Sequence, residues 1–150
     1  MITSNTSNTT DATREAVQAL LGRMGEGDPA RIAELFAERV DWKLDWPAEE
    51  HGRAVTPWIR DRSTRAEVAD HFRQIGEHHV SGEAGNVIER ILVDGADAVV
   101  TGEIRQTARP TGRPYRARIA LYLTVENGLV TRYHVYEDSL AVAQAFQSHG

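Results

Sequence analysis

Asn127-Gly128 separates two stretches in which apolar and polar residues alternate, 115–126 and 129–137. Asn-Gly supplies the two positive φ angles that a tight type I′ turn needs, and alternation is typical of a strand with one buried face. After Asp138 the apolar spacing becomes helical. We therefore predict a hairpin closed by a C-terminal helix, with Asp138 or Ser139 as its N-cap, and expect this unit to form the back wall of any pocket.

Composition narrows the class of protein. The chain has 150 residues, 41% hydrophobic and 26% charged, which suits a single globular domain. Its 17 basic and 22 acidic residues form no basic run, so no nucleic-acid partner is expected. It has no Cys, no apolar run approaching the roughly 18 residues of a membrane span, and no secretory signal at its polar start. We expect a cytoplasmic protein with a disordered polar tail over 1–10 and one domain over 11–150.

Two helices are predicted in the N-terminal part of the chain. Apolar residues recur at helical spacing from Val17 onwards, with the N-cap at Thr10 or Asp11 and glycines at 25 and 27 to end the helix. Asp28-Pro29 then provides an N-cap and a first helical residue for a second, short helix.

A strand and a long loop follow. Alternation from Arg39 to Trp46 predicts a strand whose buried face carries Val40, Trp42, Leu44 and Trp46. Residues 47–62 contain many charges, two prolines and no periodic pattern, which predicts a loop anchored by Trp58. Loops of this length often act as functional lids.

The rest of the chain alternates between one helix and several strands. Thr64 and Glu67 form a capping box ahead of a helix that Gly76 is expected to end. Strand patterns at 87–93 and 98–109 lead by turn signals into the hairpin, which predicts consecutive antiparallel strands. The order α-α-β-α-β-β-β-β-α indicates an α+β domain whose curved sheet wraps around helices on one side.

Several short strings stand at the joints of this pattern. They are Leu35-Phe36-Ala37-Glu38, Pro57-Trp58, Pro110-Thr111-Gly112-Arg113, and Glu126-Asn127-Gly128-Leu129-Val130 leading to Tyr136-Glu137-Asp138. With the element order, they make residues 12–147 similar to the nuclear-transport-factor-2-like superfamily. That superfamily includes SnoaL-like polyketide cyclases, ketosteroid isomerases and limonene epoxide hydrolases.

The resemblance implies a cone-shaped α+β barrel, in which a curved, mostly antiparallel sheet wraps about three or four helices around an apolar cavity. It also implies a hydrophobic small molecule as ligand, no cofactor, and a homodimer that pairs the outer sheet faces.

The epoxide-hydrolase-like pattern keeps an acid inside the cone on the last strand, where this chain has Val135. That alignment places Tyr133, Val135 and Glu137 inward and the even-numbered residues between them outward. Polar groups that the pattern keeps on the first strand are replaced as well, by Trp42 and Leu44. Epoxide hydrolysis with an altered site is therefore a third alternative for the function.

Glu103 and Glu137 are the candidate proton-transfer groups. If the strand face with Glu103 and Arg105 lines the cavity, burial raises the pKa of the carboxyl toward neutrality, which suits a general acid or base, with Arg105 in support. The alternative is an ion pair on a solvated face. Glu137 would replace the acid lost at Val135, and its alternative is a residue at the rim beside the last helix.

The histidines offer no metal-binding pattern. His78-His79 would point to opposite faces of a strand, and no His-Glu-x-x-His spacing occurs, so no metal site is predicted. His71 lies at the edge of the buried stripe of its helix, where it is either a proton shuttle or an ordinary half-exposed histidine. His134, Tyr122 and Tyr136 are expected to make a subunit contact.

Large apolar residues are the candidate ligand-binding groups. Trp42 and Trp46 share a strand face and Trp58 anchors the adjoining loop, so they suit a flat, apolar ligand unless they only fill the core. The predicted lining comprises Trp42, Leu44, Trp46, Trp58, Phe72, Arg105, Ile119, Tyr133 and Val135.

These expectations favour a SnoaL-like enzyme that performs isomerisation, cyclisation or dehydration on a polyketide- or steroid-like carbonyl compound without a cofactor. Glu103, Glu137 and His71 would transfer protons. The alternative is a non-catalytic protein that binds a small molecule or dimerises through the same fold.

Overall fold

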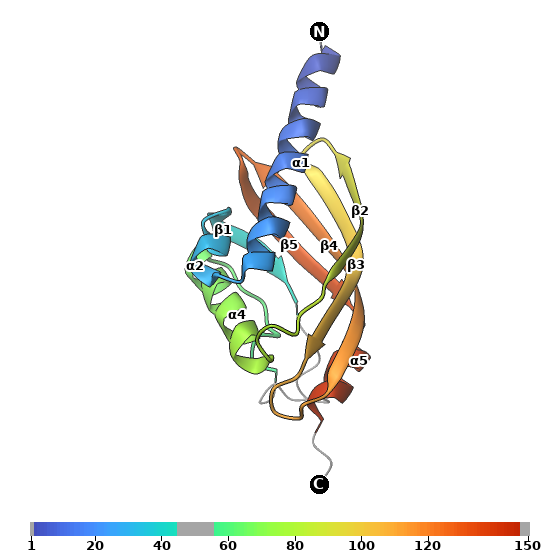
Figure 1. Ribbon diagram of the computed structural model, residues 1–150. Coiled ribbons are helices and arrows are strands. Elements are labelled where there is room, and N and C mark those ends of the chain that lie inside the picture. Colours follow the sequence, from blue (N-terminus) through green and yellow to red (C-terminus); the bar gives the residue numbers. More distant parts are fainter. Residues whose placement is uncertain (1, 45–55, 148–150) are drawn as a thin grey trace.

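The computed structural model describes residues 2–44 and 56–147 (Figure 1). Its elements are α1 (Ile2–Glu26), α2 (Pro29–Ala33), β1 (Phe36–Lys43), α4 (Arg65–His78), β2 (Val87–Asp94), β3 (Asp97–Thr107), β4 (Pro114–Glu126), β5 (Leu129–Glu137) and α5 (Ser139–Phe146). This order confirms the predicted α+β fold.

The strands form one five-stranded sheet in the order β1-β5-β4-β3-β2. Strands β2 to β5 are a consecutive antiparallel meander, as predicted, and β1 joins the far edge parallel to β5, with Trp42 opposite Tyr133. The turn between β4 and β5 has φ angles of 53° at Asn127 and 78° at Gly128. These positive values confirm the turn predicted from the Asn-Gly pair.

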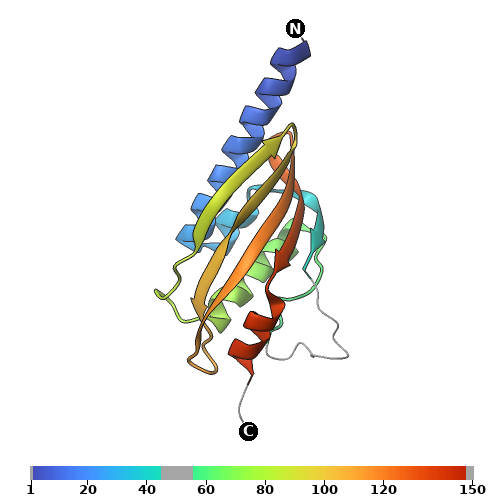
Figure 2. The same cartoon turned by 90° about the vertical axis from the view of Figure 1, so that its right-hand side faces the viewer.

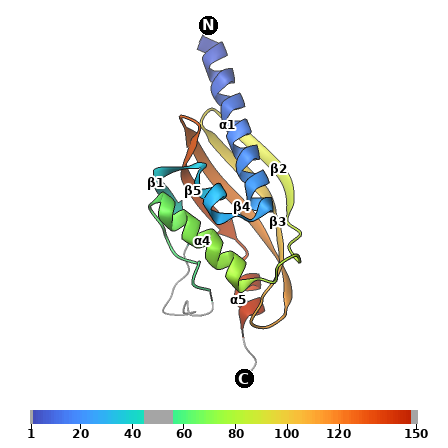
Figure 3. The ribbon, with the colours of Figure 1, turned by 60° about the vertical axis from the view of Figure 1, so that its left-hand side comes forward.

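Three helices cover one face of this curved sheet. Figure 3 shows α1, α2 and α4 in front of the strands, and Figure 2 shows the opposite face, where β2, β3 and β4 lie toward the viewer. Helix α5 sits at the end of the sheet opposite the N-terminus of α1 (Figure 1). The core lies between the sheet and the helices, and its largest fully buried side chains are Trp42, Phe36 and Phe146. The cavity described below occupies the same space.

The predicted caps hold the helices in place. The Asp28 carboxylate accepts hydrogen bonds from the first amides of α2, and the Asp138 carboxylate accepts one from the Ala141 amide at 3.1 Å. At α4, the Thr64 hydroxyl accepts from the Glu67 amide at 3.2 Å, while the Glu67 carboxylate accepts from the Ser63 amide at 3.1 Å. The capping box therefore forms with its return bond shifted by one residue.

Two helix boundaries differ from the prediction. Helix α1 begins at Ile2, and Thr10 does not cap it, because its hydroxyl accepts a hydrogen bond from the Gly95 amide at 3.2 Å in the β2–β3 turn. Helix α4 passes through Gly76 and ends at His78, with His79 as an extended C-cap. Gly27, in contrast, ends α1 as predicted and adopts a φ of 80°.

Candidate active site

A cavity of about 340 Å³ lies between the concave face of the sheet and helices α1, α4 and α5. Its walls are mainly apolar and include six residues of the predicted lining: Leu44, Trp58, Phe72, Ile119, Tyr133 and Val135. The polar groups that reach it are His71, His79, Asn86, Gln106, Tyr115 and Glu137. An apolar pocket with a few converging polar groups is the usual form of a small-molecule site.

Glu137 is the acidic residue among the described lining residues. It ends β5, opposite Ile119 of β4, and its Oε1 is shielded from solvent without a hydrogen-bond partner in the described part of the chain. Burial, reinforced by the negative charge of Asp138, raises the pKa of Glu137 to about 7. Both protonation states of this carboxyl are therefore populated near neutral pH.

Two tyrosines lie near this carboxyl. Burial and the negative charge of Glu137 raise the pKa of both Tyr115 and Tyr133, so both phenols stay protonated. The Tyr133 ring is held by Trp42, which stacks on it with ring centroids 4.4 Å apart. Of the two phenols, Tyr133 can donate a hydrogen bond to a ligand oxygen.

A chain of hydrogen bonds links α4 to β4 and β3. His79 Nδ1 lies 2.7 Å from the Ile75 carbonyl oxygen, and His79 Nε2 lies 2.6 Å from the Tyr115 hydroxyl. The Tyr115 hydroxyl is also 3.0 Å from Oε1 of the Gln106 side-chain amide. Burial lowers the pKa of His79, which keeps its ring neutral. The sequence did not indicate this trio.

His71 is also buried, with 2% of its surface exposed, so the interpretation as a half-exposed histidine is wrong. Burial and the positive charge of Arg62 lower the pKa of His71 to about 3. Its Nδ1 lies 3.2 Å from the Trp58 carbonyl, which can only accept, so Nδ1 carries the proton. A ring held neutral in this way does not fit a proton shuttle near neutral pH, and it instead positions Trp58.

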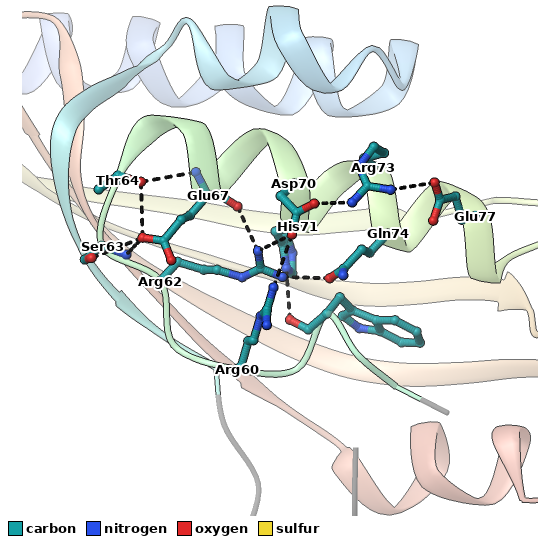
Figure 4. Close-up of polar contacts among 11 residues, drawn as sticks. Arg60, Arg62, Ser63, Thr64, Glu67, Asp70, His71, Arg73, Gln74 and Glu77 are labelled. Atoms are coloured by element: carbon teal, nitrogen blue, oxygen red, sulfur yellow. Dashed lines mark hydrogen bonds and ion pairs between the residues drawn. The ribbon is translucent and has the colours of Figure 1, made fainter. Parts of the chain in front are cut away.

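Figure 4 shows the polar network that holds the Trp58 loop against α4. The buried Arg62 side chain donates to Asp70 at 2.8 Å, to Gln74 at 2.8 Å and to the Glu67 carbonyl at 3.1 Å. Asp70 also pairs with Arg60 and Arg73, and the Arg62 and Arg73 guanidinium groups lower the pKa of Asp70 to about 2. This network fixes one wall of the cavity from behind.

Glu103 and Arg105 lie outside the cavity, contrary to the expectation for that strand face. They pair with each other at 2.6 Å, while Ile104 and Gln106 point to the cavity from the other face of β3. The alternative of an ion pair on the outer face is therefore the observed one. Alternation defined which residues share a face, but it did not define which face is buried.

The two described tryptophans lie in different surroundings. Trp58 lines the cavity, whereas Trp42 is 1% exposed and packs behind Tyr133 as part of the core. Trp46 lies outside the described residues. The inward positions predicted for Tyr133, Val135 and Glu137 are those observed.

Within residues 2–44 and 56–147, no cluster of three or more His, Asp or Glu side chains could hold a metal ion. Nor does any helix in that part of the chain have the length and apolar character needed to cross a bilayer.

Solved structures of other proteins share this architecture. An NTF2-like protein from Burkholderia thailandensis shares 22% identity and a TM-score of 0.75, over 91% of this chain and 98% of that one. An isomerase candidate from Rhodopseudomonas palustris shares 24% identity and a TM-score of 0.60, over 88% and 90% of the two chains. TerC, co-crystallised with polyporic acid, shares 17% identity and a TM-score of 0.74, over 91% and 99%.

These structural likenesses show the fold. No curated protein matches the chain significantly. Residues 17–133, however, match the family described as the SnoaL-like domain. Because that match covers well over half of its length, the chain belongs to the SnoaL-like domain family.

Proposed function

We propose that this protein is a cofactor-independent acid/base enzyme of the isomerase type, acting on an uncharged, hydrophobic carbonyl compound. The observation that carries the proposal is the Glu137 carboxyl, which lies in an apolar cavity with Oε1 buried and unpaired among the described residues. With a pKa of about 7, Glu137 can take up a proton and return it at neutral pH.

The proposed reaction needs one group that moves the proton and one that holds the oxygen. The Glu137 carboxylate removes a proton from a carbon next to the carbonyl, and the C–H electrons form an enolate. A phenol hydrogen bond to the enolate oxygen stabilises it, and Tyr133 is our candidate donor because it lines the same cavity. The protonated Glu137 then returns the proton to another carbon, so the double bond shifts without loss of atoms.

The cavity favours a small and uncharged substrate. Its volume of about 340 Å³ lies at the lower end of the range of about 300–1,000 Å³ for small-molecule sites. Of the described residues that line it, none is Arg or Lys, so a ligand carboxylate or phosphate would be buried without a counter-charge. The isomerase candidate from Rhodopseudomonas palustris supports an isomerase-type reaction by its likeness in fold.

Deuterium exchange tests the proposal. We expect the protein in D₂O to accelerate exchange of the acidic C–H protons of 2-tetralone, a flat bicyclic ketone, as followed by NMR. Glu137→Gln should lower this acceleration by about 100-fold or more, since general acid/base catalysis contributes about 10²–10⁴-fold. The control Glu103→Gln, on the outer face, should retain it.

Exchange no faster than in buffer, or equally fast in Glu137→Gln, would contradict the proposal. Tight binding of 2-tetralone without exchange would favour the alternative of a protein that only binds a small molecule.

We propose a homodimer through the outer sheet face as the assembled form. Tyr136 is 61% exposed there, and the Tyr122 and His134 rings pack edge to face beside it with centroids 5.8 Å apart. Aromatic residues of this kind are enriched in interfaces. Analytical ultracentrifugation should give a dimer that Tyr136→Lys weakens, and a monomer for the unmodified chain would contradict this assembly.

A further inference from the structure

The hydrogen bonds around His79 define where its proton lies. The Ile75 carbonyl can only accept, so Nδ1, 2.7 Å away, carries the ring proton. Burial, together with the nearby Arg109 guanidinium, lowers the pKa of His79 and keeps the imidazole neutral, and the neighbouring His78 acts in the same direction. Nε2 is then an acceptor, and the 2.6 Å contact with Tyr115 must use the proton of the phenol.

The Tyr115 oxygen consequently acts as an acceptor toward its other neighbours. The atom assigned 3.0 Å from the phenol oxygen is Gln106 Oε1, which cannot donate; since the Tyr115 proton is directed to His79, we assign the Gln106 amide the reversed orientation, in which its N–H donates to the phenol oxygen. A hydroxyl oxygen has two lone pairs, and Gln106 uses one of them. The second can accept a hydrogen bond from a molecule in the cavity.

This acceptor and the Glu137 carboxyl face the same space. Tyr115 and Ile119 lie on one face of β4, and Ile119 is directly opposite Glu137 in the β4–β5 register. Tyr115 and Glu137 line the same cavity of about 340 Å³, so a single ligand can contact both groups. The described lining residues provide no Arg or Lys that would favour a ligand anion there.

We propose that Tyr115 and His79 form a hydroxyl-binding site, and that the cavity selects an uncharged, flat, apolar molecule with a phenol or enol hydroxyl. The binding part of this inference stands alone, and its catalytic part rests on the proposed function. An enol is one end of the keto–enol change that Glu137 would catalyse.

In the step from enol to ketone, one proton leaves the ligand oxygen and one is added to a ligand carbon. The ligand hydroxyl, which donates a hydrogen bond to the Tyr115 oxygen, releases its proton to water, while His79 stays neutral and keeps the Tyr115 proton directed to its Nε2. The electrons of the ligand O–H bond form the carbonyl, the C=C electrons form a new C–H bond, and Glu137 supplies that hydrogen as a proton. The Glu137 carboxylate then regains a proton from water.

Binding of two matched probes tests the site. 2-Naphthol carries one hydroxyl, and 2-methoxynaphthalene has the same ring system with that donor blocked. We expect 2-naphthol to bind about three- to tenfold more tightly by isothermal titration calorimetry, the worth of about one hydrogen bond. Tyr115→Phe should abolish this preference while leaving the affinity for 2-methoxynaphthalene unchanged, which also shows that the variant is folded. Glu103→Gln should keep the preference.

A second measurement does not depend on any variant. The ¹⁵N chemical shifts of His79 should identify the neutral form protonated at Nδ1, with Nε2 shifting when 2-naphthol binds. Equal or weaker binding of 2-naphthol, no binding of either probe, a preference that survives in Tyr115→Phe, or a proton on Nε2 would overturn the proposal. Glu137→Gln separates the two proposals, because it should lose deuterium exchange and retain the preference for 2-naphthol.

Discussion

The buried Glu137 carboxyl should make the unfolding free energy of the protein depend on pH. Its pKa of about 7 in the folded protein lies above the ordinary value of 4.5, so the folded state holds the proton more tightly than the unfolded state. Its contribution is fully present below pH 4.5 and is lost as the pH rises to 7 and beyond. At about 1.4 kcal/mol for each tenfold change, the loss is about 3 kcal/mol of unfolding free energy.

Glu137→Gln tests this magnitude because the amide stays neutral at every pH. Near pH 5 the free energies of unfolding of wild type and variant should be similar, and above pH 8 the variant should be more stable by about 3 kcal/mol. Urea titrations between pH 5 and pH 8.5 would show this as a difference of about 1.5 M in the midpoint, for a slope of about 2 kcal/mol/M.

The matched control is Glu103→Gln, whose carboxylate pairs with Arg105 on the outer face. Its unfolding free energy should differ from that of wild type by less than about 1 kcal/mol and should fall with rising pH as in wild type, because the variant retains Glu137. Parallel pH profiles for wild type and Glu137→Gln would contradict this prediction, because they would mean that the Glu137 carboxyl has the same pKa in the folded and the unfolded protein.

Three further predictions concern the surroundings of the site. Arg62→Met should lower the unfolding free energy by about 3 kcal/mol, since it removes the three hydrogen bonds of a side chain that is 1% exposed, whereas Arg73→Met, at a side chain that is 52% exposed, should cost less than about 1 kcal/mol in urea titrations. Gly102→Ala should cost about 1–3 kcal/mol and release β2 in amide-exchange measurements, because the new methyl would collide with the Val87 carbonyl oxygen; Gly85→Ala, in open space, should not. Asp138→Asn should keep the cap of α5 and lower the pKa of Glu137 in an NMR titration, and an unchanged or higher pKa would contradict the assigned charge effect.

The fold was largely predictable because its signals are local. Asn127-Gly128 admits few turns, and that turn sets the register of β4 and β5. Asp28 and Thr64 mark helix starts because their side chains bind the nearest free amides. The prediction that Gly76 ends α4 was wrong. Glycine favours a helix end where the backbone turns to positive φ, and Gly76 does not adopt such an angle.

The site was only partly predictable because it depends on distant contacts. Glu137 was placed correctly through the family resemblance, which indicated which side chains of β5 face the cavity. The face that carries Glu103 stayed open, and its candidate catalytic role lapsed, because its own strand shows alternation without showing the buried side. His79 and Tyr115 are 36 residues apart, and they meet because His79 follows the end of α4 and pairs with Ala108 beside β3. The alternation that turns Ile119 inward also turns Tyr115 inward, and this was the available signal.

Titration of Glu137 is the most direct test of its proposed acid/base role. In protein labelled with ¹³C at glutamate side chains, the carboxyl resonance that disappears in Glu137→Gln can be followed by NMR from pH 4 to pH 9. We expect a midpoint near pH 7. A midpoint near 4.5, the ordinary value for glutamate, would contradict it, because the carboxyl would then be charged in the cavity at neutral pH and burial would not tune it toward the pH at which it is proposed to act.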